Sequence, residues 1–169
     1  MPFNKEKFEE VLNYIISKCG TLENIGKTTI YKLLYFSDFD YFEKYETSIT
    51  GEDYIKLPHG PAPTSNHFIQ AIASLKAKNF IRPSRTIYHG HPQEKFLPLK
   101  QPILKYLSAQ ELQVINQVID RLCGLNATQI SELSHMDMPW KATQDDDVID
   151  YHLVFYREPL TSVREYLEE

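Results

Sequence analysis

The residue types that could carry out chemistry in this 169-residue sequence do not form a catalytic pattern. Ser134 and His135 are neighbours in the chain, and adjacent residues on a helix do not face each other. Neither a Gly-x-Ser-x-Gly elbow nor a glycine-rich phosphate loop is present. Asp38 and Asp40 are two residues apart, so they point to different sides of a helix. We therefore predict that the protein is not an enzyme, with an unrecognised hydrolase as the least favoured class.

The histidines and the clustered aspartates form only a weak metal pattern. His89 and His91 would need His59 or His67 as further ligands, and zinc sites usually show a tighter ligand set. The run Asp145 to Asp147 lacks the spaced carboxylates of a calcium loop. We predict neither a metal nor another cofactor.

Positive charge gathers in the middle of the chain, although the net charge is −5. Residues 56–105 carry eight Lys or Arg and one acidic residue, whereas residues 106–169 carry four and twelve. This asymmetry predicts either a surface for an anionic partner or packing of the basic segment against the protein's own acidic segments. The candidate nucleic-acid contacts are Lys76, Lys78, Arg82, Arg85 and Lys95.

Apolar periodicity and capping residues predict the helices that position these groups. Asn4 begins a helix that ends at Gly20, and further helices are predicted over 27–46 and 64–78 and from the caps Ser108, Asn126 and Ser162. Residues 80–99 predict a β-hairpin with a longer loop at 89–94. Residues 150–156 predict a short strand or a helical turn. A helix followed by a hairpin is also the order of a winged helix, so DNA binding is an alternative function.

Residues 27–46 are apolar over so much of the helix circumference that we expect this helix at the centre of the fold. Asp38 lies within the apolar face and must find a partner there, because an unpaired buried charge is costly. The His59-Gly60-Pro61 turn that follows is rigid. The predicted fold class is α+β, predominantly α-helical, with five to six helices around the central helix (27–46) and one small β-hairpin (about 80–99).

The central helix and the turn together resemble the Panacea domain, the SocA-like antitoxin and phage-associated family. The resemblance rests on the order and spacing of Lys32, Leu33, Leu34, Tyr35, Phe36, Tyr54, Lys56, His59, Gly60 and Pro61. His59 stands where the family more usually has Tyr. Ser134, His135 and Trp140 match the second half of the family pattern, so the resemblance covers about residues 5–143. It implies one domain over 1–169, with 144–169 as an extension that packs on it.

The resemblance implies an antitoxin that neutralises a protein toxin by direct binding or by delivering it to a protease such as a ClpXP-type machine. The expected partner-binding residues are Tyr31, Tyr35, Asp38, Tyr54, His59, Gly60, Pro61 and Trp140. We expect Tyr35 and Asp38 at the mouth of a groove walled by the His59-Gly60-Pro61 turn. The alternative is an internal contact of Asp38 with a lysine or with Trp140.

The chain contains no apolar run of membrane-spanning length, and its first residues are charged. We therefore expect a cytoplasmic protein with no membrane partner. Cys19 and Cys123 are expected to be reduced thiols.

Overall fold

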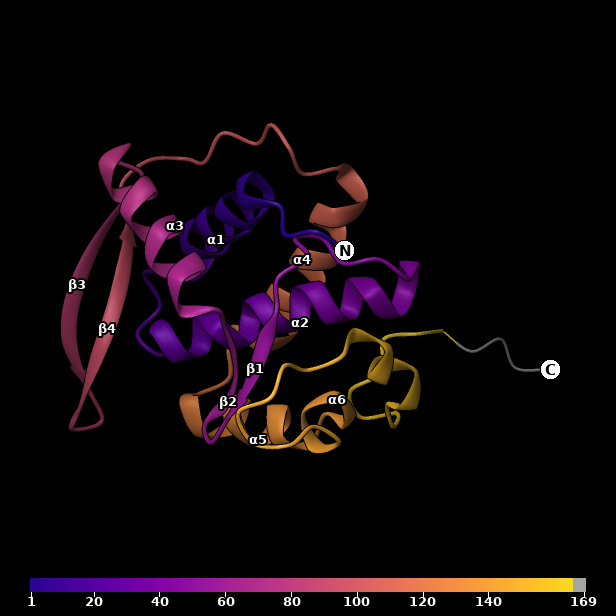
Figure 1. The fold of residues 1–169 in the computed structure, drawn as a ribbon. Helices are drawn as coiled ribbons and strands as arrows, with labels where there is room; N and C mark the ends of the chain where they lie inside the picture. The colour runs from indigo at the N-terminus through magenta and orange to yellow at the C-terminus, as the bar shows by residue number, and fades with distance from the viewer. Residues whose placement is uncertain (166–169) are drawn as a thin grey trace.

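Helix α2 (Lys27–Tyr45) crosses the middle of the molecule, and the other elements lie around it (Figure 1). The computed structural model describes residues 1–165. These residues form a mixed fold of α-helices, one 3-10 helix and two antiparallel two-stranded sheets. The remaining elements are α1 (Lys5–Cys19), β1 (Tyr54–Leu57), β2 (Gly60–Pro63), α3 (Ser65–Ala77), β3 (Ile81–Tyr88), β4 (His91–Pro98), α4 (Ala109–Leu122), α5 (Ala127–Met136), α6 (Met138–Lys141) and the 3-10 helix η1 (Tyr151–Tyr156).

The central position predicted for α2 is confirmed, since 14 of its 19 residues are buried. They include four charged side chains that a surface helix would expose, namely Lys32, Asp38, Asp40 and Glu43. An enclosed helix of this kind must satisfy its charges inside the protein. How the fold does so determines the geometry of the candidate site.

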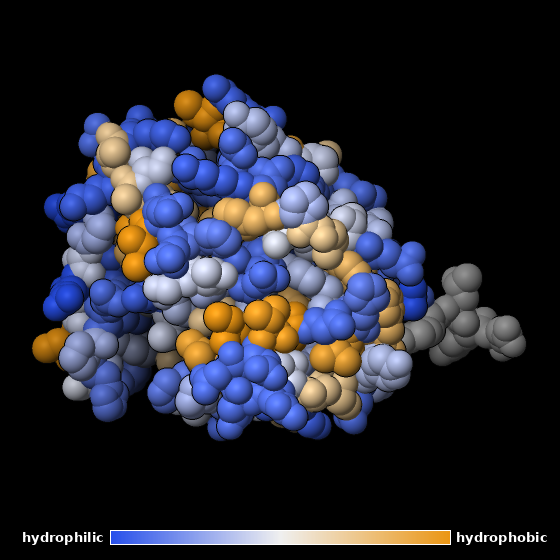
Figure 2. Space-filling view, in the orientation of Figure 1, coloured by the Kyte–Doolittle hydropathy of each residue, from blue (hydrophilic) through white to orange (hydrophobic). Residues whose placement is uncertain are grey.

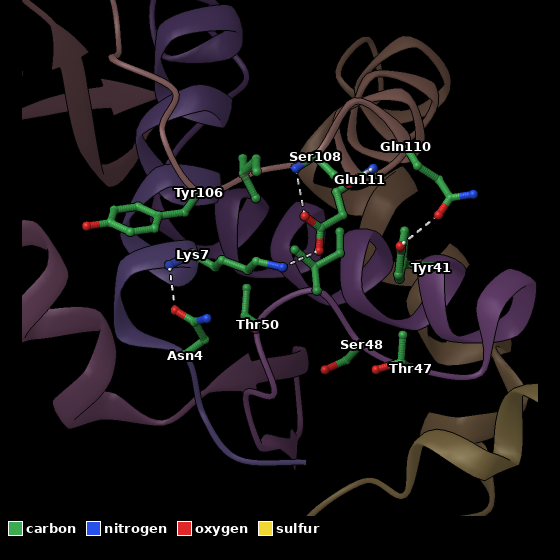
Figure 3. Close-up of polar contacts among 12 residues, drawn as sticks. Asn4, Lys7, Tyr41, Thr47, Ser48, Thr50, Tyr106, Ser108, Gln110 and Glu111 are labelled. Atoms are coloured by element: carbon green, nitrogen blue, oxygen red, sulfur yellow. Dashed lines mark hydrogen bonds and ion pairs between the residues drawn. The ribbon is translucent and has the colours of Figure 1, made fainter.

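Side-chain caps begin three of the helices as predicted. The Asn4 side chain accepts a hydrogen bond from Lys7 N at 3.0 Å at the start of α1. Ser108 with Glu111, and Asn126 with Gln129, form capping boxes at the starts of α4 and α5. Lys7 Nζ also lies 2.7 Å from Glu111 Oε2, which ties α1 to α4 (Figure 3).

The first hairpin, β1–β2, was not predicted. Tyr54 pairs with Pro63 and Leu57 with Gly60, so the connection is the two-residue turn Pro58-His59. A strand that reads Gly-Pro-Ala-Pro has none of the β-branched or aromatic residues that mark strands, and prolines disfavour strand interiors. The prediction of a single hairpin was therefore wrong.

The other edge of β1 is covered by a later segment. Lys56 N donates to Asp147 O at 3.0 Å, and Ile149 N donates to Tyr54 O at 2.8 Å. Ile55 and Val148 form an isolated antiparallel bridge. Because these bonds occupy the outer edge of β1, the hairpin does not offer this edge for pairing with another chain.

The second hairpin, β3–β4, is the predicted one, but its connection is shorter than expected. Tyr88 pairs with His91, and the two turn residues His89 and Gly90 have φ angles of 48° and 77°. Two positive φ angles define the type I′ turn that suits the twist of a hairpin. The expected loop over 89–94 was wrong, since residues 91–94 belong to β4.

After α6 the chain runs back along α2. Residues 151–156 form the 3-10 helix η1, which packs against α2. The prediction of a helix from Ser162 is wrong for residues 162–165, which are not helical, and its remainder lies outside the described residues.

Candidate partner-binding surface

Asp38 is enclosed by neutral hydrogen-bond donors. Its carboxylate accepts from the backbone N of Ile49 and of Thr50, each at 2.9 Å. It also accepts from the Thr50 hydroxyl at 2.6 Å and from the Tyr54 hydroxyl at 2.7 Å. Burial raises the pKa of Asp38 to about 6, although the four donors act to lower it. The donors therefore hold the carboxylate in place without any cation.

The expectation that Asp38 lies at the mouth of a groove is wrong, because its side chain belongs to the core. Asp38 is 1% exposed, and Tyr35 and Tyr54 are each 0% exposed. The alternative contact of Asp38 with a lysine or with Trp140 is also wrong, since its partners lie in residues 49–54. The loop after α2 folds back over the helix and supplies the donors.

Arg157 neutralises a second group of buried carboxylates. Its Nε and Nη2 donate to the two oxygens of Asp137 at 2.8 and 2.9 Å. Its Nη1 donates to Asp40 at 2.8 Å and to Glu43 at 3.0 Å. The Tyr35 hydroxyl donates to Asp137 at 2.7 Å. Tyr35 is therefore part of an internal network that joins α2 to the segment after η1.

The turn that begins β2 lies directly against α2 and α5. Gly60 has a φ angle of +128°, which side-chain-bearing residues rarely adopt. A Cβ at this position would lie 2.8 Å from both Lys32 Cε and Ser134 Oγ. Both the backbone conformation and the close approach thus require glycine.

Lys32 is buried beneath this turn. The one hydrogen bond of its ammonium group among residues 1–165 runs from Nζ to Thr28 O at 3.4 Å, and the residue is 4% exposed. Burial lowers the pKa of Lys32 to about 8 because no carboxylate compensates for the lost hydration.

The exposed part of the β1–β2 hairpin adjoins α5 and α6. Ser131 Oγ donates to His59 O at 3.0 Å, and Lys56 Nζ lies 4.1 Å from the centre of the Trp140 ring. The ring of Trp140 also stacks on His135 at 4.3 Å. We call this area the turn surface and define it by Lys56, Leu57, Pro58, His59, Ser131, His135, Trp140 and Val148.

The turn surface combines apolar exposure with unused polar groups. Leu57 is 39% exposed and Val148 is 53% exposed. Figure 2 shows apolar side chains gathered low on this face, where Figure 1 places β1 and the segment after α6. Trp140 Nε1 and His135 Nε2 are buried and have no hydrogen-bond partner within residues 1–165. Such groups are costly unless something pairs with them.

Tyr31 does not lie with the other expected partner-binding residues. Its ring packs edge-to-face on Phe68 at 4.9 Å, near the start of α2. The structure therefore separates the expected residues into three groups. Tyr35, Asp38 and Tyr54 are in the core, Tyr31 is at the start of α2, and His59, Gly60, Pro61 and Trp140 belong to the hairpin and its neighbours.

The candidate nucleic-acid residues are also divided. Lys76, Lys78, Arg82 and Arg85 are exposed. Lys95 is buried and donates to Leu22 O at 2.6 Å and to Ile25 O at 2.9 Å. Its expected role as a phosphate contact is therefore wrong, because the ammonium group fastens β4 to the loop between α1 and α2.

Other reactive groups are few in the described part of the chain. Burial raises the pKa of the Cys19 thiol to about 12, so this thiol is a weak nucleophile. No group of three or more His, Cys, Asp or Glu within residues 1–165 is placed to hold a metal ion. Among the same residues, no helix has the length and apolar character needed to cross a bilayer.

The class of fold is thus a mixed domain of helices and two small sheets, built on one enclosed, charge-bearing helix with a glycine-dependent hairpin packed against it. The sequence model of a family described as antitoxin SocA-like, Panacea domain, matches residues 30–141, about two thirds of the chain. The chain belongs to this family. Neither a curated protein nor a solved structure matches it. The matched range contains Asp38 and the turn surface up to Trp140, whereas α1, Val148 and Arg157 lie outside it.

Proposed function

We propose that this protein is the antitoxin of a toxin–antitoxin pair and that it neutralises a protein toxin by direct binding in the cytoplasm. Membership of the SocA-like antitoxin family supports an antitoxin role and a non-enzymatic one. The observation that carries the binding site is the exposed, partly apolar hairpin turn, in which Leu57, Pro58 and His59 are all exposed.

The buried members of the expected site support this surface from below. Tyr54 begins β1 and is fixed by its bond to Asp38, while Gly60 lets the turn approach Lys32 and Ser134. The side chains available to a partner are those of Leu57, Pro58 and His59, which are exposed. We infer that the core residues position the turn and that the turn makes the contact.

Paired variants on two exposed leucines test the site. Leu57→Asp should abolish neutralisation of the toxin encoded beside this gene and its capture in a pull-down. Leu99→Asp, at a leucine that is 54% exposed after β4, is the matched control and should retain both. Because both positions are on the surface, the free energy of unfolding should change by no more than about 0.5 kcal/mol in either variant. If the folded Leu57→Asp variant neutralised the toxin fully, the turn would not be part of the binding site.

Toxin levels distinguish direct binding from delivery to a protease. With direct binding, the toxin accumulates in a complex with the antitoxin and remains inactive in cells that lack a ClpXP-type protease. With delivery, the toxin disappears in the presence of the antitoxin and becomes active again when the protease is deleted.

The DNA-binding alternative now depends on Lys76, Lys78, Arg82 and Arg85. The net charge of −5 weakens non-specific attraction to DNA. A gel shift with the upstream DNA, comparing the wild type with Arg82→Glu/Arg85→Glu, tests this alternative. A shift that the double variant abolishes would favour it.

A further inference from the structure

The segment that covers the outer edge of β1 extends the apolar part of the turn surface. Ile55 and Val148 are paired across the antiparallel bridge, so their side chains lie on the same face of the sheet. Leu57 shares that face, because side chains two residues apart on a strand point the same way. Leu57 is 39% exposed and Val148 is 53% exposed, so this apolar face is open to a partner.

Three consecutive aspartates border the apolar face. The pairing that places Val148 also places them, since Lys56 N donates to Asp147 O at 3.0 Å and Asp146 N donates to Lys56 O at 2.9 Å. Asp145, Asp146 and Asp147 are all exposed, and we call these three residues the acidic rim. Figure 2 shows hydrophilic side chains directly beside the apolar group low on this face.

The protein supplies little positive charge to the acidic rim. Residues 142–150 carry four aspartates and no lysine or arginine, and Lys56 is the one lysine or arginine in the first hairpin. Lys56 Nζ donates to Thr143 O at 2.9 Å and lies 3.9 Å from Asp145 Oδ1. The Lys56 side chain is 12% exposed, whereas that of Asp145 is 92% exposed. The lysine is therefore held inward while the carboxylate faces solvent.

The other two carboxylates of the rim are uncompensated in the described part of the chain. Asp146 and Asp147 form no ion pair with any of residues 1–165. Neighbouring carboxylates repel one another and create a negative potential over the surface around them. A cation brought to the rim would relieve this repulsion.

The charge of the rim limits which partners can bind the apolar face. Protein interfaces combine an apolar centre with a polar border, and the border selects a partner of opposite charge. An acidic partner would be repelled. Two copies of this chain could not pair through their turn surfaces without bringing two acidic rims together, which is unfavourable for the same reason.

We propose that the turn surface binds a basic segment of the toxin. An apolar side chain of that segment packs on Leu57 and Val148, and lysine or arginine side chains beside it pair with the acidic rim. This proposal rests on the proposed antitoxin function and adds the chemistry of the partner. The rim lies outside the range 30–141 that the family model matches, and Leu57 lies inside it. The rim can thus restrict this chain to its own toxin without altering the part that defines the family.

Binding kinetics with the purified toxin encoded beside this gene test the charge of the partner. Asp145→Asn/Asp146→Asn/Asp147→Asn removes the charge of the rim, and asparagine tolerates the φ angle of 67° at position 146. At low salt this variant should associate about tenfold more slowly or worse, because charge steering raises association rates by about 10–10³-fold. Its dissociation rate should change less. Association of the wild type should slow as NaCl is added, and the variant should lose most of this dependence.

The matched control removes three exposed carboxylates at other sites. Glu6→Gln/Glu23→Gln/Asp120→Asn changes the net charge by the same amount, at residues that do not belong to the turn surface or its rim. This control should associate at nearly the rate of the wild type, because salt screens charges that are distant from the contact. Thermal melts of both variants check that they are folded. Equal slowing in the two variants would overturn the proposal, since net charge alone would then explain the effect.

The remaining outcomes separate this proposal from the proposed function. If Leu57→Asp abolished binding while the rim variant associated normally, the basic partner would be refuted and the binding site would stand. If Leu57→Asp bound normally, the site itself would be refuted, and this proposal with it. The competing occupant is the basic segment 56–105 of a second copy. Sedimentation of the antitoxin alone tests it, and a dimer that the rim variant dissociates would assign the rim to self-association and overturn the proposal.

Discussion

Asp38 and Asp40 are two residues apart on α2 and equally buried, yet the fold stabilises their buried carboxylates in different ways. Asp38 has four neutral donors, all within 16 residues along the chain. Asp40 has two arginines, of which Arg157 is 117 residues away and Arg121 is 81 residues away. The first solution depends on a local loop, whereas the second requires distant parts of the chain to meet.

The two solutions have different physical consequences. Neutral donors orient a carboxylate without cancelling its charge, so burial still raises the pKa of Asp38 to about 6. Burial raises the pKa of Asp40 as well, but there Arg157 and Arg121 oppose the effect of burial with full positive charges. The site at Asp38 should therefore respond to pH, and the site at Asp40 should respond to the loss of an arginine.

Removing Arg157 should have the largest effect. Arg157→Met keeps much of the side-chain volume but leaves Asp40, Glu43 and Asp137 facing one another without their shared cation. Breaking a buried pair in this way costs about 3–5 kcal/mol. Urea unfolding at pH 7 measures the loss. A loss below about 1 kcal/mol would mean that the carboxylates do not depend on this arginine.

Asp38 should make stability depend on pH. Its pKa is about 6 in the folded protein against an ordinary value of 3.8, so the unfolded chain loses the proton first as the pH rises. The stability linked to Asp38 is therefore complete below about pH 4 and is lost as the pH rises through about 6. The total is about 3 kcal/mol. The difference in unfolding free energy between the wild type and Asp38→Asn isolates this change, and a constant difference from pH 4 to 7 would contradict it.

Tyr54→Phe should have a smaller effect at the same site. The change removes one of the four donors to Asp38 and leaves the ring in place. A hydrogen bond to a charged group contributes about 1.5–3 kcal/mol, and its loss should raise the pKa of Asp38 further. Urea unfolding measures the loss, with Tyr45→Phe as control at a tyrosine that is 39% exposed. Equal effects of the two substitutions would show that the Tyr54 hydroxyl is not part of the Asp38 site.

Arg121→Met should have the smallest effect. Arg121 bonds the same Asp40 as Arg157 does, but its side chain is 44% exposed and that of Arg157 is 0% exposed. Exposed ion pairs contribute about 0–1 kcal/mol. If Arg121→Met destabilised the protein as much as Arg157→Met, burial would not be the reason for the difference between the two arginines.

Local sequence signals were sufficient for most of the helices. Asn4, the Ser108–Glu111 box and the Asn126–Gln129 box each act within four residues, so the chain itself shows where a helix begins. The wide apolar face of residues 27–46 correctly placed α2 at the centre. The hairpin predicted at 80–99 was found from short apolar runs with Gly90 and Pro92 between them, and its strands pair from 81 to 98.

The candidate site was harder to predict because its contacts join distant residues. Nothing near Arg157 in the sequence shows that its partners are Asp40, Glu43 and Asp137. A polar group in the apolar face of a helix either borders a groove or has an internal partner. We favoured the groove for Tyr35 and Asp38, although the residues of the helix itself do not distinguish the two outcomes. Only the path of residues 47–54 decides between them.

The segment that covers β1 and the position of Arg157 together determine whether a shorter fragment of this protein could fold alone. A fragment of residues 30–141, the range that defines the family, would retain all three carboxylates of the second site but lose their shared arginine. It would also expose the outer edge of β1, which residues 146–149 now occupy. Such a fragment should aggregate rather than fold. The range that defines the family is thus shorter than the range that this protein needs to fold. A relative that keeps the three carboxylates should supply its own cation from outside the shared range.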